Sequence, residues 1–286
     1  MIHEHPSVTN LRPLPFDPKY HYKDNSNNIK LGEKNKARII NECFQSDEYR
    51  KIRTTYYDAG ETQVFNSLWY PRPHLEYGTG GDDENGGGSG SGGERKIRNP
   101  LPLLGIDLIQ FRDRFLVVID FQPLTEKGEQ SEGDITTMSM DMTFQQQVEK
   151  LWGDIPSILK GKMSNRFYDE AQFFSDHMIF GRFSRDEGLG HSPGDSGVIH
   201  DKLWDAFQKY VLLYMDMVDS ARRETTTDEE VYDLTKILQR QKEYDIYSAE
   251  RDPAHGLFVR VFGTEFATGF MTEFLFSLSS TKKEDD

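Results

Sequence analysis

The chain has 286 residues and a formal net charge of −14, with 36% hydrophobic and 29% charged residues, which fits one large domain over residues 1–286. The negative charge argues against a general nucleic-acid binder, because phosphate backbones are bound by clustered Lys and Arg, and no apolar run approaches the ~20 residues of a membrane-spanning helix. The single cysteine, Cys43, excludes an internal disulfide framework and an iron–sulfur cluster held by four protein thiolates.

The first predicted feature is an N-terminal arm over residues 1–36, which is rich in Pro, Asn, Lys and His and lacks periodicity. We expect it to be irregular or to form two short edge elements. The apolar residues that follow Ala37 predict a short helix. Residues 51–70 predict two strands around a turn at 58–60. Residues 78–93 are rich in glycine and predict a flexible insertion, because such a segment does not recover the entropy lost on ordering.

A hairpin is predicted over residues 101–111 and 115–122, and it carries two aspartates in apolar surroundings, Asp107 and Asp120. A buried carboxylate is costly if charged and unpaired, so it finds a partner, stays protonated or serves chemistry. A turn centred on Asp113 sends the two acids to opposite faces of the sheet, whereas a two-residue turn changes that register. With the centred turn, we assign Asp120 a structural role as a buried hydrogen-bonding acid.

The second half of the sequence is predicted to be mainly helical. Apolar residues recur with helical spacing over 144–159, 201–222 and 231–247, and residues 264–276 predict a final helix. Residues 178–183 predict one more strand. Strands mostly first and helices mostly later indicate an α+β fold with a largely antiparallel sheet covered by helices.

Motif analysis identifies no resident redox centre. The sequence has no Gly-x-Gly-x-x-Gly, Cys-x-x-Cys-His, His-Glu-x-x-His or Gly-x-Ser-x-Gly motif, and its eight histidines are scattered. We therefore expect no metal and no bound cofactor, so that electrons for any redox reaction come from outside the chain. A further acid, Asp252, precedes Pro253 in otherwise apolar surroundings, and it is interpreted either as a proton donor or as a helix cap.

Four separated motifs follow one another along the chain. They are Tyr57-Asp58-Ala59-Gly60 with Gln63-Val64-Phe65-Asn66-Ser67, then Pro102-Leu103-Leu104-Gly105-Ile106-Asp107-Leu108, then Asp120-Phe121-Gln122-Pro123-Leu124, and last the block over 247–258. In this order they resemble the ferredoxin-dependent bilin reductases, from about Tyr49 to Phe276. The resemblance implies an α/β/α sandwich that binds biliverdin between the sheet and the C-terminal helices. It also implies that reduced ferredoxin supplies single electrons and that the protein protonates the resulting bilin radical.

The resemblance also assigns roles to three residues. Asp107 and Asp252 fall on the two aspartates that are proposed as proton donors in the family. Asn66 takes the place of a histidine that shares a proton with the substrate in the phycocyanobilin-forming members. This implies a two-electron reduction of biliverdin to 15,16-dihydrobiliverdin, the first step of phycoerythrobilin biosynthesis. The alternatives are a four-electron reductase that forms phycoerythrobilin and a non-catalytic bilin carrier.

The two propionates of biliverdin call for basic side chains, because such pairs are charge-assisted and geometrically selective. Arg182 is the first choice, and Asn66 is a second substrate contact. Arg251 and Arg260 flank Asp252 and are weaker candidates for the propionates.

An acidic partner such as ferredoxin requires a local basic face on a chain of net charge −14. The next bilin reductase of the pathway is a further expected partner, and we expect a monomer. The glycine-rich insertion favours a plastid stroma, with a cyanobacterial cytoplasm as the alternative. The N-terminus lacks the pattern of a secretory signal. Two groups of residues are candidates for the basic face that ferredoxin would contact. One group is Arg95, Lys96 and Arg98, and the other is Arg112 and Arg114.

Overall fold

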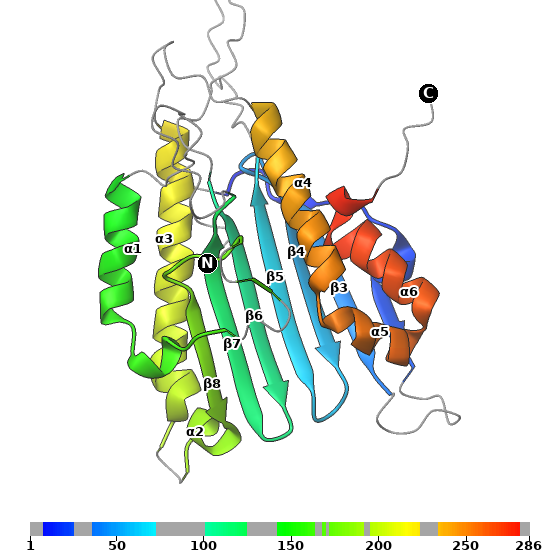
Figure 1. Ribbon diagram of the computed structural model, residues 1–286, viewed down its shortest axis with the longest axis horizontal. Coiled ribbons are helices and arrows are strands. Elements are labelled where there is room, and N and C mark those ends of the chain that lie inside the picture. Colours follow the sequence, from blue (N-terminus) through cyan, green and yellow to red (C-terminus); the bar gives the residue numbers. More distant parts are fainter. Residues whose placement is uncertain are drawn as a thin grey trace, which may run out of the picture.

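The computed structural model shows one antiparallel sheet with helices on both faces (Figure 1). It describes residues 8–25, 36–72, 101–124, 142–163, 168–169, 172–191, 195–223 and 234–280. The strands are β1 (Arg12–Pro13), β2 (Tyr22–Asp24), β3 (Arg38–Gln45), β4 (Tyr49–Asp58), β5 (Gln63–Pro71), β6 (Leu103–Phe111), β7 (Arg114–Gln122) and β8 (Ile179–Ser184). The helices are α1 (Met142–Asp154), α2 (Arg185–Leu189), α3 (Trp204–Arg223), α4 (Leu234–Arg251), α5 (Ala254–Phe262) and α6 (Thr264–Gly269).

The sheet is the middle of three layers. Within the described residues its order is β1-β3-β4-β5-β6-β7-β8, with β2 also paired to β3, and each of these pairs is antiparallel. One face packs on α1 and α3 in a core that includes Ile119 and Tyr214. The other face packs on α4, α5 and α6 in a second core that includes Leu68 and Phe270. The predicted α/β/α sandwich is therefore confirmed.

The predicted helix after Ala37 is wrong, because residues 38–45 form strand β3. Burial alternates along this strand, with Ile39, Asn41 and Cys43 inside and the residues between them exposed. Ile39 and Cys43 are four residues apart, which fits a helix as well as a strand, so local spacing did not decide between them. Pairing with β4 on one side and with β1 and β2 on the other favours the strand.

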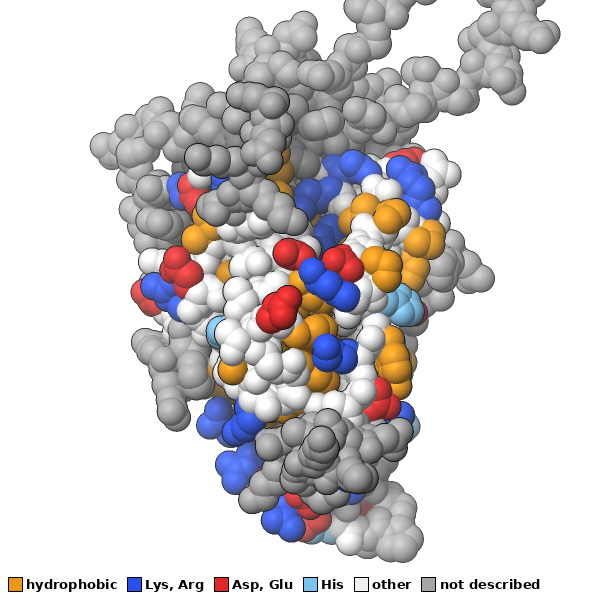
Figure 2. All heavy atoms as spheres, turned by 90° about the vertical axis from the view of Figure 1, so that its right-hand side faces the viewer, with side chains coloured by type: hydrophobic (Ala, Val, Ile, Leu, Met, Phe, Trp, Pro, Cys, Tyr) orange, Lys and Arg blue, Asp and Glu red, His pale blue; other side chains and the backbone are white. Residues whose placement is uncertain are grey.

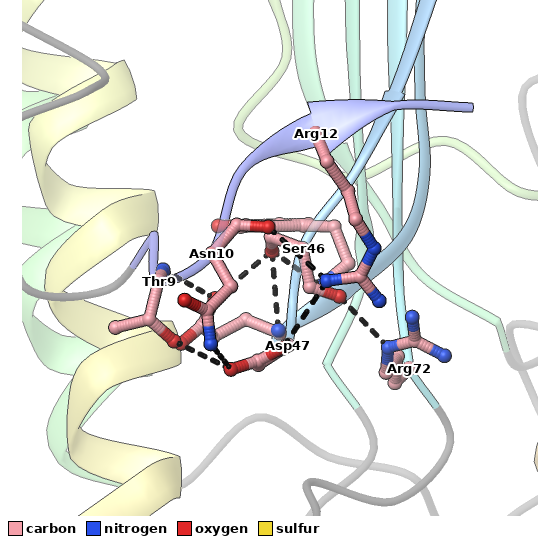
Figure 3. Close-up of polar contacts among 8 residues, drawn as sticks. Thr9, Asn10, Arg12, Ser46, Asp47 and Arg72 are labelled. Atoms are coloured by element: carbon pink, nitrogen blue, oxygen red, sulfur yellow. Dashed lines mark hydrogen bonds and ion pairs between the residues drawn. The ribbon is translucent and has the colours of Figure 1, made fainter.

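The described part of the N-terminal arm lies at the sheet edge as the two short strands β1 and β2, which was one of the two expectations for it. Side chains fix it to the connection between β3 and β4 (Figure 3). The Asn10 amide donates to Asp47 at 2.6 Å and the Thr9 hydroxyl donates to the same carboxylate at 3.3 Å. Arg72, just after β5, donates to the Ser46 carbonyl at 2.9 Å, so both neighbouring segments hold this connection.

The elements predicted for the second half are present with small shifts. The predicted strand 178–183 is β8, and the three internal helices are α1, α3 and α4. The predicted final helix is α6, which continues as a π-helical segment over Phe270–Leu275. α5 begins directly after Pro253. The predicted insertion at 78–93 lies outside the described residues.

The β6–β7 hairpin turns on two residues, 112 and 113, and this overturns the predicted separation of its two acids. In the observed register Asp107 lies opposite Val118, and Asp120 lies opposite Gly105. Cross-strand partners share a face, as do residues two apart along a strand. Asp107 and Asp120 therefore lie on the same face, the one covered by α4 to α6, because a shift of one residue reverses every side chain of a strand.

Candidate active site

A row of polar side chains crosses the sheet face that α4 to α6 cover. The register makes Asn41 of β3, Thr55 of β4, Asn66 of β5 and Asp107 of β6 successive cross-strand partners. Asn41 and Thr55 are buried, whereas Asn66 and Asp107 are half-buried. The Oγ1 of Thr55 and the Oδ1 of Asn41 have no hydrogen-bond partner among the described residues. Buried polar atoms without partners are costly, so this row is suited to a polar ligand.

Asp107 belongs to a hydrogen-bonded chain of three side chains. The Asn66 amide nitrogen donates to Asp107 Oδ1 at 2.6 Å, and the Arg53 guanidinium of β4 donates to Asn66 Oδ1. Burial raises the pKa of Asp107, while the Asn66 hydrogen bond and the charge of Arg53 oppose that rise. The net upward shift favours the protonated acid, which is the form that a proton donor needs.

Asp252 lies between α4 and α5 and is half-buried. Its Oδ1 accepts a hydrogen bond from the Ala254 backbone N–H at 2.8 Å, so the predicted capping contact is present. The pKa of Asp252 is nevertheless raised to about 6, chiefly by burial and in smaller part by the negative charge of Asp107. Arg53 acts in the opposite direction on both acids. A sheet acid and a helix-side acid thus share one electrostatic environment.

Aromatic hydroxyls surround the two acids. Burial holds the pKa of Tyr168 well above its usual value, and the charges of Asp252 and Asp107 add to that shift. Tyr168 is therefore a neutral O–H group beside both carboxyls. On α4, the Tyr244 hydroxyl donates to Gln122 Oε1 of β7 at 2.7 Å, which ties the helix to the sheet next to the site.

Asp120 is a buried hydrogen-bonding acid, as predicted. It lies on the same sheet face as Asp107, however, and not on the opposite face. It is fully buried and accepts hydrogen bonds from the Ser175 backbone N–H at 3.0 Å and from the Ser175 hydroxyl. These contacts hold the segment before β8 against β7 and leave the two remaining acids as the candidates for chemistry.

The predicted propionate ligands lie at exposed positions outside the acid pair. Arg182 of β8 is the cross-strand partner of Leu116, and its exposed side chain lies on the same sheet face as Asp107. It is two strands away from Asp107, in line with Ile109 of β6. Arg251, the last residue of α4, lies over the Tyr247 ring at 4.4 Å and forms an ion pair with Glu250 at 3.2 Å. Neither arginine has a described contact with Asp107 or Asp252, and their roles stay predictions.

The described part of the predicted basic surface is balanced by acids. Arg112 pairs with Glu61 at 3.1 Å and Arg114 pairs with Asp113 at 3.0 Å. Residues 95–98 lie outside the described residues. On the side of α5 and α6, Figure 2 shows acidic and basic side chains intermingled among hydrophobic ones.

The described residues hold neither a cluster of potential metal ligands nor a membrane-spanning helix. No group of three His, Cys, Asp or Glu side chains has an arrangement that suits a metal ion. Among the helices described, none combines the length and the apolar character that a membrane span requires.

Sequence reasoning missed Arg53 and Tyr168. Part of the signal for Arg53 was present, because Lys51, Arg53 and Thr55 alternate along a predicted strand. Only the observed register, which pairs Thr55 with Asn66, shows that they share a face with Asn66. Tyr168 lies in an irregular segment, and no local pattern places such a residue near Asp252.

Comparison with known proteins identifies the family. A family model described as "Ferredoxin-dependent bilin reductase" matches residues 95–277. The chain belongs to the ferredoxin-dependent bilin reductases. One relative in this family is a 15,16-dihydrobiliverdin:ferredoxin oxidoreductase from Nostoc punctiforme, 35% identical over 85% of this chain and 80% of that protein. Another with the same name, from Gloeobacter violaceus, is 34% identical over 82% and 76% of the two chains.

Two further proteins show a more distant similarity. A phycoerythrobilin:ferredoxin oxidoreductase from Nostoc punctiforme is 27% identical over 95% of this chain and 88% of that protein. The crystal structure of phytochromobilin synthase from tomato, in complex with biliverdin, matches with a TM-score of 0.61 at 22% identity, covering 94% of this chain and 78% of that one. The second match supports the observed fold.

Proposed function

We propose that this bilin reductase transfers two electrons from reduced ferredoxin to biliverdin and forms 15,16-dihydrobiliverdin for phycobilin synthesis. The observation that carries the proposal is the likeness to the 15,16-dihydrobiliverdin:ferredoxin oxidoreductases at 35% and 34% identity over more than four fifths of the chain. The buried acids support it, because a reductase that receives electrons from outside contributes mainly by placing protons.

The proposed reaction consumes two electrons and two protons. Each ferredoxin delivers one electron, so the bilin passes through a radical that must be protonated at a chosen carbon. Asp107 from the sheet and Asp252 from the helical layer each supply one proton in this proposal. Support comes from the pKa values, since burial raises both and an acid with a raised pKa keeps its proton to a higher pH.

Asn66 supports reduction at the methine bridge between rings C and D. An amide has no accessible protonation equilibrium near neutral pH, so Asn66 does not share a proton with the substrate as an imidazole would. It holds Asp107 by a hydrogen bond instead. In this proposal Arg182 or Arg251 binds a bilin propionate at the exposed edge of the site.

Product analysis tests the proposed function. The purified protein is incubated without oxygen with biliverdin, reduced ferredoxin and a reductant that regenerates it, and the pigment is identified by chromatography and absorption. We expect 15,16-dihydrobiliverdin. Phycoerythrobilin as the product favours the four-electron reductase instead. Bound but unreduced biliverdin contradicts both and favours a carrier.

We further propose a monomer that passes its product to the next reductase of the pathway. Size-exclusion chromatography with light scattering tests it: a single species of monomer mass is expected, and a stable dimer contradicts the first part.

A further inference from the structure

Arg53 is a buried cation that is linked to the candidate proton donor, Asp107, through Asn66. Only 2% of the residue is exposed, and it lies on β4 on the same sheet face as Asp107. Its guanidinium packs over the Phe276 ring with 5.3 Å to the ring centroid. Its Nη1 donates to Asn66 Oδ1, while its Nε is buried without a hydrogen-bond partner among the described residues. Burial of a guanidinium is costly, so such a residue calls for an explanation.

The contact with Arg53 determines which way the Asn66 amide points. A guanidinium has only donors, so the Asn66 atom that faces it is the carbonyl oxygen. The amide NH2 group then faces Asp107 and donates to its Oδ1 at 2.6 Å. An oxygen that accepts from an amide is a poor place for the proton of a neutral acid. The proton of Asp107 is therefore placed on Oδ2.

We propose that Arg53 is a positioning residue, which acts through Asn66 to keep the transferable proton on the Asp107 oxygen that does not face Asn66. This inference rests on the proposed role of Asp107 as a proton donor. Without the guanidinium, the Asn66 amide is free to turn its carbonyl oxygen toward Asp107. The acid then donates its proton to the amide, and less of it is available to the bilin.

A double-mutant cycle between Arg53 and Asn66 tests the proposal, because coupling measures whether one residue acts through the other. The proteins are Arg53→Met, Asn66→Ala and the double variant, assayed with biliverdin and reduced ferredoxin. We expect Arg53→Met to lower kcat by a factor on the order of 100, the usual effect of misplacing a reacting group. The Kd for biliverdin changes little. In the Asn66→Ala background, the same replacement has almost no further effect on kcat.

Lys51→Met is the matched control. Lys51 lies two residues before Arg53 on the same strand and is likewise buried, but it donates to the Phe274 carbonyl and the Ser277 hydroxyl. We expect this variant to be less stable and to keep its kcat. An equal loss of kcat in Lys51→Met and Arg53→Met would show that Arg53 matters only as a buried cation that supports the fold.

Three further results decide the remaining cases. An equal factor for Arg53→Met with and without Asn66 overturns the proposal, as does unchanged kcat in Arg53→Met beside an inactive Asp107→Asn. Full turnover by Asp107→Asn refutes the proposed role of Asp107 as a proton donor, whereas product analysis of the wild type tests the proposed function separately. If Arg53→Met does not fold, the cycle is repeated with Arg53→Lys, which keeps the charge but loses the planar guanidinium. A smaller fall in kcat is expected for Arg53→Lys, and that fall should again disappear in the Asn66→Ala background.

Discussion

Burial is the largest influence on the protonation of both candidate donors. Asp107 accepts a hydrogen bond from a side chain and Asp252 accepts one from the backbone, and both contacts stabilise the carboxylate. Desolvation exceeds these contributions at each site, so both pKa values rise. The hydrogen-bond partners of the two acids therefore do not offset burial, and both acids hold their protons more firmly than an exposed aspartate does.

The pKa of Asp252 predicts how activity depends on pH. With a value of about 6 in the free enzyme, Asp252 loses its proton above that pH, and kcat/KM for biliverdin is expected to fall there. The groups that influence it are Asp107 from β6, Arg53 from β4, Tyr168 and the Ala254 N–H. Initial rates across the neutral range, with ferredoxin reduction kept fast, measure the profile. A kcat/KM that rises with pH through this range contradicts the assignment.

The electrostatic coupling of the two acids gives a second prediction. Asp107→Asn removes a negative charge that raises the pKa of Asp252, so that pKa is expected to fall. Titration of the 13C-labelled aspartate carboxyls by NMR measures the shift in the folded protein without requiring activity. Asp120→Asn is a useful comparison, because that acid is not among the influences on Asp252. An unchanged pKa in Asp107→Asn would mean that no ionised Asp107 lies close to Asp252 in the folded protein.

Asp252 is also expected to limit stability at high pH. Its pKa of about 6 in the folded protein exceeds the value of about 3.9 for an unfolded aspartate. A raised pKa contributes stability that is full below the unfolded value and is lost as the pH rises through about 6. Asp252→Asn keeps an oxygen for the Ala254 N–H and carries no charge. Its Tm should therefore exceed that of the wild type at alkaline pH, and the difference should shrink at acidic pH; a constant difference would contradict this reasoning.

At the scale of elements, α4 is fastened to the sheet and to the C-terminal segment through the buried Asp245. The carboxylate accepts from the Tyr70 hydroxyl of β5 at 2.7 Å and from the Leu278 N–H at 2.9 Å. Arg50 and Lys51 lie close enough to lower its pKa against the effect of burial. Asp245 is thus one of the polar anchors that hold the C-terminal helices, which form one wall of the candidate site.

Removal of this anchor should weaken the whole fold. Asp245→Ala leaves the buried Tyr70 hydroxyl and the partly buried Leu278 N–H without their acceptor. It also removes the negative charge near Arg50 and Lys51, so we expect the free energy of unfolding to fall by about 3 kcal/mol or more. Asp245→Asn keeps an acceptor oxygen and should lose less. Urea unfolding followed by circular dichroism compares the three proteins. Equal and small losses in both variants would show that Asp245 does not anchor α4.

Most of the strands and helices were predictable from the sequence. The alternation within each strand predicted β4 to β8, and helical spacing predicted α1, α3 and α4. The prediction that Asp107 and Asp120 lie on opposite faces was wrong, because it depended on whether the β6–β7 hairpin turns on two residues or three. The short helix predicted after Ala37 was wrong, because the apolar spacing of residues 38–45 fits both a helix and the strand that they form.

Some residues of the candidate site were predictable from the sequence and others were not. Asp107, Asn66 and Asp252 were found through motifs, and the structure brings them into one environment. Their influence on one another was not predictable, since Arg53 and Tyr168 come from other elements and local patterns carry no information on such contacts. The unpartnered oxygens of the polar row likewise depend on the whole register of the sheet.

For the whole molecule, the net charge of −14 opposes an acidic electron donor. A productive complex then depends on local attraction, which salt screens over about 8 to 10 Å at physiological ionic strength. We expect the KM for ferredoxin to rise with added salt, while the Kd for biliverdin, measured without ferredoxin, changes less. A KM that falls with salt would instead show that overall repulsion governs the encounter.

The three-layer architecture places one acid on the sheet and one at the α4–α5 junction, and the central claim is that these two acids protonate the reduced bilin. Single-turnover reactions of biliverdin with reduced ferredoxin test it most directly, in the wild type, Asp107→Asn and Asp252→Asn, followed by absorption and electron paramagnetic resonance. The account predicts that the wild type forms 15,16-dihydrobiliverdin, whereas each variant accumulates a bilin radical and little product. Formation of that product at the wild-type rate by both variants would contradict it.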